Sequence, residues 1–117
     1  MSQPTHDQNL IQKPDLQAIF IDRDGTIGGS GHFLHPKEFT RYPNAVTALA
    51  LLKSAGLKLL AFTNQHRIAS GEATMAEFIE QFKAFGFENA YICPHALEVE
   101  CECRKPNPVT AAGRARI

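Results

Sequence analysis

The segment Asp22-Arg23-Asp24-Gly25-Thr26 places two carboxylates at i and i+2, next to a glycine that lets the chain turn at once. Asp22 can attack phosphorus and form an aspartyl-phosphate, and Asp24 can protonate the leaving oxygen and later activate water. A phosphate repels bare carboxylates, so the chemistry needs a divalent cation, and Mg²⁺ bound by Asp22 and Asp24 suits these ligands. Two such aspartates alone would more often cap a turn, but an apolar strand before them favours catalysis.

A second group of candidate ligands consists of Cys93-x-His95 and Cys101-x-Cys103, which are separated by the five residues 96–100. Three cysteines make a poor disulfide framework, whereas three thiolates and one imidazole can fill a tetrahedral Zn²⁺ site. Because all four positions are filled, the spacing predicts a structural zinc that folds the loop 93–103. The alternative is three reduced cysteines beside an incidental histidine.

The apolar pattern predicts the elements that position these residues. Short apolar runs predict strands over 16–21, 57–62 and 90–92, and the nearly continuous run 16–21 suits a strand buried on both faces. Helical spacing predicts one helix with Asn44 as its N-cap and Gly56 as its stop, and another between a Thr74–Glu77 capping box and Gly86. Strands that alternate with helices imply right-handed crossovers and a parallel sheet. Functional side chains of such sheets gather at the carboxyl ends of strands.

Three motifs together resemble the haloacid dehalogenase superfamily. Asp22-x-Asp24-Gly25-Thr26 resembles its first motif, Thr63 its second and Lys105 its third. The resemblance implies that Thr63 holds the phosphoryl oxygens and that Lys105 offsets charge on the phosphoryl group and the nucleophile. Taken alone, Thr63 would more often be a strand-end threonine that bonds to the nearby backbone, and Lys105 would more often be a solvated surface lysine. The order of the three motifs and their context make the resemblance specific.

Two further stretches narrow the resemblance to one branch of the superfamily. Thr63-Asn64-Gln65 and Cys103-Arg104-Lys105-Pro106 resemble histidinol-phosphate phosphatase and D,D-heptose bisphosphate phosphatase. This branch carries a similar zinc loop, and its members imply that Arg23, Asn64 and Arg104 bind the substrate. The implied fold is α/β, a Rossmann-like three-layer parallel sheet, with a minimal cap because 27–42 is short.

The sequence departs from the branch in two places. Its members carry a fourth, acidic motif after another strand, but none of the twelve residues after Lys105 is Asp or Glu, so the fold is expected to be incomplete at its C-terminus. His66 and Arg67 stand where related enzymes have small residues. We therefore keep two hypotheses for the function. The chain is an enzyme that hydrolyses a small phosphomonoester with Mg²⁺, or it is a catalytically inactive, truncated fragment or zinc-stapled binding module of the same fold.

Length and composition set the remaining expectations. The 117 residues suit one small domain, which we divide into a flexible leader (1–15), a phosphatase core (16–108) and an irregular tail (109–117). Zero formal net charge argues against a dedicated nucleic-acid binder, and no apolar run reaches the ~18 residues of a membrane span. A polar N-terminus without a signal sequence predicts a cytoplasmic protein. The expected partner is a small-molecule phosphate ester, bound by a monomer.

Overall fold

The computed structural model describes residues 17–30, 32–107 and 113–116. Its elements are β1 (Ala18–Ile21), η1 (Pro36–Glu38), α2 (Pro43–Ser54), β2 (Lys58–Asn64), η2 (His66–Ile68), α3 (Met75–Ala84), β3 (Asn89–Cys93) and β4 (Gly113–Arg116), where η1 and η2 are short 3₁₀ helices. The predicted order of strand, helix, strand, helix, strand is confirmed from β1 to β3. The predicted leader 1–15 lies outside the described residues. Among the described residues, no helix has the length and apolar character that crossing a membrane requires.

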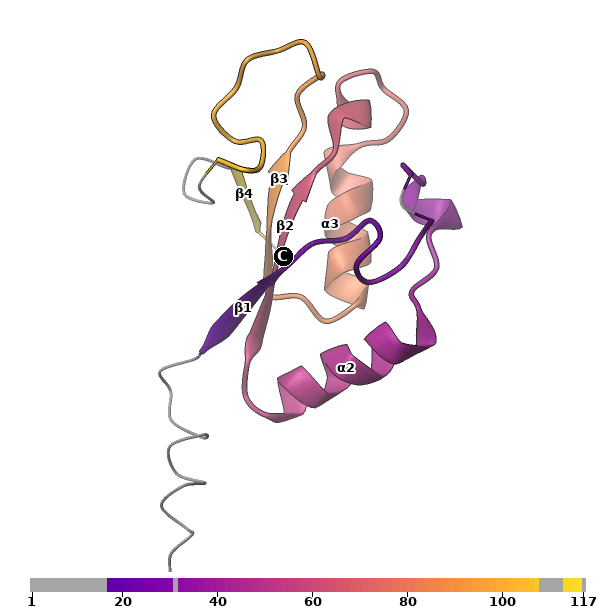
Figure 1. Cartoon of the computed structure of the whole chain (residues 1–117), viewed down its shortest axis with the longest axis vertical. Coiled ribbons are helices and arrows are strands. Elements are labelled where there is room, and N and C mark those ends of the chain that lie inside the picture. The colour runs from indigo at the N-terminus through magenta and orange to yellow at the C-terminus, as the bar shows by residue number, and fades with distance from the viewer. Residues whose placement is uncertain (1–16, 31, 108–112, 117) are drawn as a thin grey trace, which may run out of the picture.

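The first three strands form the predicted parallel sheet, in the order β1-β2-β3 (Figure 1). The register places Ile21 opposite Ala61 and Thr63 opposite Ile92. Parallel strands end at the same edge of a sheet. The residues that follow β1, β2 and β3 therefore lie at one edge: Asp22, Gln65 and the loop 93–103, called the zinc loop below after its predicted ligands. The α/β fold class is confirmed.

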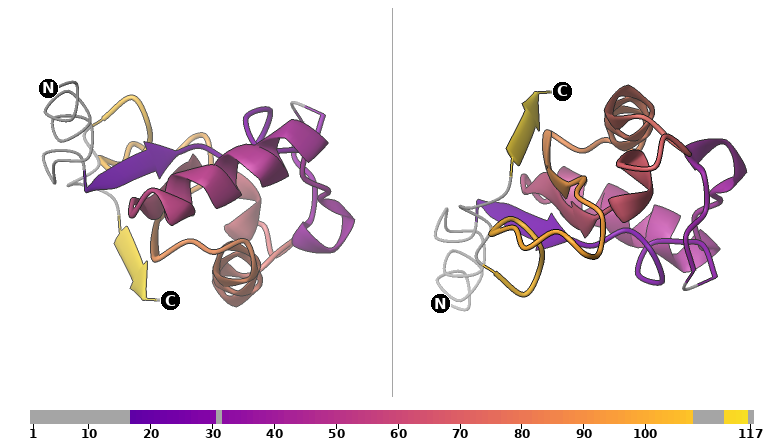
Figure 2. Two further views of the ribbon diagram at one scale, coloured as in Figure 1. Left: turned by 90° about the horizontal axis from the view of Figure 1, so that it is seen from below. Right: turned by 90° about the horizontal axis from the view of Figure 1, so that it is seen from above.

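The third layer of the predicted sandwich is absent from the described ranges. Both α2 and α3 lie on the same face of the sheet (Figures 1 and 2). Right-handed crossovers that step twice in one direction, from β1 to β2 and from β2 to β3, place both helices on one side. The opposite face has no helical cover within the described part of the chain.

The burial of side chains along the strands reflects the position of the helices on one face. Leu59 and Ala61 point into the helical side and are fully buried, whereas Phe20 keeps 46% of its surface exposed. Phe20 makes edge-on contacts with the rings of Phe62 and Tyr91, whose centroids lie 6.2 Å and 5.6 Å from its own. The prediction that the first strand is buried on both faces is therefore wrong for this face, because no described helix covers it; among the contacts of the described residues, the Lys105 Nζ lies 5.5 Å from the centroid of the Phe62 ring.

The helix ends agree with the sequence signals in all but one case. Thr74 and Glu77 form the predicted capping box, and Gly56 and Gly86 follow their helices with φ of 91° and 92°, a conformation that glycine adopts without strain. The predicted N-cap Asn44 is wrong, since α2 begins at Pro43. Proline suits the first position of a helix because its missing N–H would have no intrahelical partner there.

The tail also differs from the prediction. Within 109–117, predicted to be irregular, Gly113–Arg116 forms β4, which pairs antiparallel with β3 through Ala115 opposite Ala90. An open sheet edge offers unpaired N–H and C=O groups, and an extended segment can satisfy them whatever its side-chain pattern. Side-chain patterning therefore gave no signal for this strand.

Candidate active site and metal centre

Asp22 and Lys105, far apart in the sequence, meet at the carboxyl end of β1. The Lys105 Nζ lies 2.9 Å from the Asp22 Oδ1, which also accepts a 2.7 Å hydrogen bond from the Arg23 amide. The Asp22 side chain remains 42% exposed. A cation thus lies against a partly accessible carboxylate, an arrangement that can offset negative charge during attack on a phosphate.

Gln65 joins two of the predicted catalytic residues. Its Nε2 donates to the Asp24 Oδ2 at 2.6 Å and to the Thr63 Oγ1 at 3.0 Å. Gln65 and Thr63 are 2% and 1% exposed, so the amide that makes both bonds is shielded from bulk water. Gln65 had no predicted role, although its position directly after an apolar strand was a usable signal.

Arg23 does not face a substrate, and the prediction that it binds one is corrected. Its side chain is fully buried, and its guanidinium lies 3.9 Å from the Phe39 ring centroid and 4.8 Å from that of Phe78. Burial lowers the pKa of Arg23, and the adjacent Asp24 partly offsets this effect. A guanidinium enclosed by two rings has no free surface for a ligand.

The polar contacts of Arg23 connect Asp24 to the surrounding loop and helix. Its Nη1 donates to the Asp24 Oδ1 at 2.7 Å, its Nη2 to the Leu34 carbonyl and its Nε to the Gln81 Oε1, both at 3.0 Å. Gln81 in turn donates to the Pro36 carbonyl. Sequence reasoning missed Gln81, although a polar residue three positions after Phe78, on the buried stripe of α3, was a usable signal.

Asn64 holds the backbone of Lys105. Its Oδ1 accepts from the Lys105 amide at 2.9 Å, and its Nδ2 lies 3.5 Å from the Lys105 carbonyl. The end of β2 thereby fixes the loop that carries the lysine. The predicted contact between Asn64 and substrate phosphate stays a prediction, since the backbone of Lys105 uses both ends of this amide.

Arg104 is bonded to the zinc loop. Its Nη1 donates to the carbonyls of Leu97 and Val99 at 3.1 Å and 3.4 Å, and its Nη2 donates to those of His95, at 2.9 Å, and Ala96. These bonds close the loop onto the residue next to Lys105. The predicted contact of Arg104 with substrate phosphate also stays a prediction.

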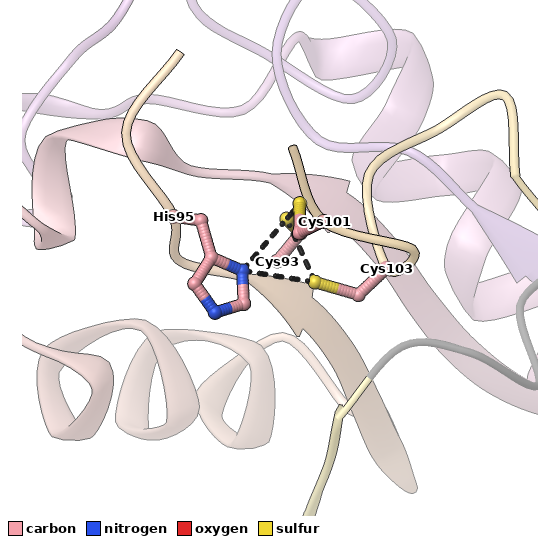
Figure 3. Close-up of side chains that lie close together, drawn as sticks. All are labelled: Cys93, His95, Cys101 and Cys103. Atoms are coloured by element: carbon pink, nitrogen blue, oxygen red, sulfur yellow. Dashed lines mark hydrogen bonds between the residues drawn. The ribbon is translucent and has the colours of Figure 1, made fainter. Parts of the chain in front are cut away.

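The predicted zinc ligands lie together (Figure 3). Their donor atoms are all within 4.8 Å of one another; the Cys93 Sγ lies 3.5 Å from that of Cys101 and 2.9 Å from that of Cys103, which is 3.1 Å from the His95 Nδ1. Tetrahedral Zn–S bonds of about 2.3 Å place sulfurs about 3.8 Å apart. The four residues therefore fit Zn²⁺ after shifts of under about 1 Å.

The pKa values of two thiols in this cluster, Cys101 and Cys103, shift in opposite directions. Burial raises the pKa of Cys101, but hydrogen bonds from Cys93, Cys103 and the Arg104 backbone outweigh burial and lower that pKa to about 7. Burial, with the two neighbouring sulfurs, raises the pKa of Cys103 to about 12. Three thiolates at this distance repel one another, and a bound cation removes that repulsion.

The donor set around Asp22 and Asp24 fits Mg²⁺. This cation takes a few carboxylate oxygens and keeps several waters, which requires ligands that water can reach. The Asp22 and Asp24 side chains are 42% and 22% exposed. Within the described ranges, the Asp22 Oδ2 has no hydrogen-bond partner.

Several curated proteins are similar to this chain in sequence. No family model matches it. It is 36% identical over 101 residues to the Probable D-glycero-D-manno-heptose-1,7-bisphosphate 7-phosphatase of Thermoplasma volcanium, with 78% of this chain and 69% of the relative covered. The D-glycero-beta-D-manno-heptose-1,7-bisphosphate 7-phosphatase of Helicobacter pylori is 37% identical over 103 residues, with 79% and 60% covered. The enzyme of that name from Escherichia coli K12 is 34% identical, with 80% and 58% covered.

Two solved structures resemble the fold. D,D-heptose 1.7-bisphosphate phosphatase from B. bronchiseptica, crystallised with magnesium and phosphate, aligns with a TM-score of 0.66 at 29% identity over 79% of this chain and 57% of that one. A HAD-like phosphatase from Mesorhizobium loti aligns with a TM-score of 0.61 at 28% identity over 84% and 55%. Of these relatives and structures, all but the Thermoplasma protein are matched over 55–60% of their own length.

Proposed function

This chain belongs to the haloacid-dehalogenase-like phosphatase family that contains the heptose bisphosphate 7-phosphatases, and we propose that it hydrolyses a small phosphomonoester with Mg²⁺. The observation that carries the proposal is the 2.9 Å contact between Lys105 and Asp22. It joins two family motifs that lie on separate loops. The magnesium and phosphate in the B. bronchiseptica structure support the same assignment.

The proposed reaction has two steps at Asp22. An Asp22 oxygen forms a bond to phosphorus while the bond from phosphorus to the ester oxygen breaks, and Asp24 gives its proton to the leaving alcohol. Asp24 then takes a proton from a water, whose oxygen displaces Asp22 and releases inorganic phosphate. Lys105 and the Thr63 hydroxyl stabilise the phosphoryl oxygens. Mg²⁺ held by Asp22 and Asp24 would neutralise the repulsion between carboxylate and phosphate.

Zinc has a structural role in this proposal. Cys93, His95, Cys101 and Cys103 would hold Zn²⁺ and fold the loop whose carbonyls Arg104 binds. Lys105 follows Arg104 directly, so an ordered loop keeps its ammonium group on Asp22. No step of the reaction passes through the zinc.

Hydrolysis of a generic aryl phosphate tests the proposal. The purified chain, loaded with Zn²⁺ and supplied with Mg²⁺, is expected to release phosphate, and Asp22→Asn should abolish release because an amide is not a competent nucleophile. Glu80→Gln, an exposed change on α3, is the control and should behave as wild type. Equal rates for wild type and Asp22→Asn would refute the mechanism; a folded, zinc-loaded chain without turnover favours the alternative of a zinc-stapled binding module.

A further inference from the structure

Lys105 lies along the face of β2 that no described helix covers. Phe62 and Asn64 stand two residues apart on this strand, so their side chains point to the same face. Asn64 accepts a hydrogen bond from the Lys105 amide at 2.9 Å, and the Lys105 Nζ lies 5.5 Å from the centroid of the Phe62 ring. The lysine side chain therefore runs along the strand from its backbone anchor at Asn64 to the ring of Phe62.

Asp22 lies beside Phe62 across the sheet. β1 and β2 are neighbours (Figure 1), and Ile21 is paired with Ala61. Asp22 and Phe62 are the residues that follow this pair on the two strands. The Lys105 ammonium group, 2.9 Å from the Asp22 Oδ1, thus contacts a carboxylate at the end of one strand and an aromatic ring on the next.

The ring of Phe62 can restrain this ammonium group in a way that an aliphatic side chain cannot. The face of an aromatic ring attracts a cation within about 6 Å of its centroid. Lysine has a flexible stem and a strongly hydrated head, and the Lys105 side chain is 26% exposed, so water competes with Asp22 for the ammonium group. Phe20 packs edge-on against Phe62, with the ring centroids 6.2 Å apart, and this contact fixes the ring in turn.

We propose that Phe62 is a positioning residue, which holds the Lys105 ammonium group against Asp22 so that it is in place when a phosphoryl group arrives. The inference rests on the proposed function, because the phosphate must bind at Asp22. An ammonium group that is already ordered loses less freedom when it binds the phosphoryl oxygens. The alternative is that Phe62 only packs against Phe20 and stabilises the sheet.

Titration of the zinc-loaded chain with inorganic phosphate in the presence of Mg²⁺ tests the proposal. Phe62→Leu keeps an apolar side chain and removes the ring, and we expect phosphate affinity to fall about two- to five-fold, the size of a cation–π contact at a partly exposed site. Phe62→Tyr keeps a ring and should bind as wild type does. Tyr91→Leu is the matched control, because it removes from the same face a ring that contacts Phe20, and it should also bind as wild type does.

A double-mutant cycle separates positioning from packing. If Phe62 acts through Lys105, Phe62→Leu should change phosphate affinity by less than about two-fold in a Lys105→Met background. An equal loss with and without Lys105 would overturn the proposal, and so would equal losses for Phe62→Leu and Tyr91→Leu.

Two controls keep the result interpretable. Zinc content and circular dichroism identify a variant that has lost its fold, and Phe62→Ile, whose side chain suits a strand, then replaces Phe62→Leu. A wild-type chain that binds no phosphate would contradict the proposed function and this inference together. Phosphate binding that is equal in wild type and Phe62→Leu overturns the inference alone.

Discussion

At the scale of single residues, the position of Asp24 depends on two buried donors. Arg23 binds one carboxylate oxygen and Gln65 the other, at 2.7 Å and 2.6 Å. Arg23 is also bound by Gln81 of α3. The geometry of the proposed acid and base is therefore set by packing between the first loop, the end of β2 and α3.

Removing the buried cation should destabilise the protein. Arg23→Met removes the bonds to Asp24, Gln81 and Leu34 and leaves their acceptors without a donor, so we expect a loss of about 3 kcal/mol in the free energy of unfolding. Urea denaturation measures it. Arg67→Met is the control, because Arg67 is an exposed arginine paired with Glu72 and such pairs contribute about 1 kcal/mol or less. Equal losses for the two variants would mean that the buried bonds of Arg23 do not stabilise the fold more than an exposed ion pair does.

The role of Asp24 can be distinguished from that of Asp22 by comparing esters whose leaving groups differ in acidity. If Asp24 protonates the departing oxygen, Asp24→Asn should slow hydrolysis by roughly 10²–10⁴-fold for alkyl phosphates. Aryl phosphates with acidic phenols need less protonation and should lose clearly less. Steady-state rates on one ester of each kind give the comparison. An identical loss on both would assign Asp24 to another role, such as holding the cation.

At the scale of elements, the segment from β3 to Lys105 acts as one unit. The cluster Cys93, His95, Cys101 and Cys103 closes the loop, Arg104 binds its carbonyls, and Asn64 attaches it to β2. Few large apolar side chains are buried within it. Binding of a metal by the four residues would therefore supply most of the free energy that orders this segment.

We predict that the protein binds about one Zn²⁺ per chain through these four residues. Cys103→Ser should abolish stoichiometric binding, whereas Glu102→Gln, between two ligands, should not. Because thiols must lose protons to bind, and Cys101 has a pKa of about 7 and Cys103 of about 12, affinity should fall as the pH is lowered through neutrality. Metal analysis and competition with a chelator measure both effects. Three freely titrating thiols and no zinc would disprove the assignment.

At the scale of the whole molecule, the helices among the described residues cover only one face of the sheet. The aromatic residues Phe20, Phe62 and Tyr91 contact one another on the other face, and Phe20 is half exposed. The outer edge of β1, next to Asp22, has no strand partner among the described residues. Most of the matched relatives extend well beyond the part that this chain spans.

Covering that face should raise stability and activity together. We expect the 117-residue chain alone to turn over esters below ~1 s⁻¹, the lower end of ordinary enzyme rates. A chimera that adds the part of the Helicobacter pylori relative beyond the matched residues should melt roughly 2–4 °C higher, as expected in a domain of that size for about 1 kcal/mol from burial of Phe20. Better positioning of the phosphate should raise the rate by about 100-fold.

Calorimetry and phosphate release on both proteins test this prediction, and Phe20→Thr in the chimera should remove most of the thermal gain. A chimera that melts no higher than the original chain, or an original chain with ordinary enzyme rates, contradicts it.

Much of this architecture could be predicted because its signals are local. The Thr74–Glu77 capping box and the glycines after both helices act within one helical turn. The predicted zinc ligands lie within eleven residues of sequence, so their spacing nearly fixes their proximity. The parallel direction of β1, β2 and β3 follows from the alternation of strands and helices. These features depend on neighbours along the chain, which a sequence displays directly.

Other features depended on contacts between distant residues. Burial of Arg23 between Phe39 and Phe78 and the bond from Gln65 to Asp24 arise from packing that no local pattern encodes. β4 arose from an open edge of β3. The sequence by itself determined the two α-helices, the three parallel strands and the end of the sheet that carries the candidate site, because hydrophobic period and caps act locally. Only the tertiary structure decided which polar side chain faces the site and which supports it from the core, because burial is a property of the packed chain.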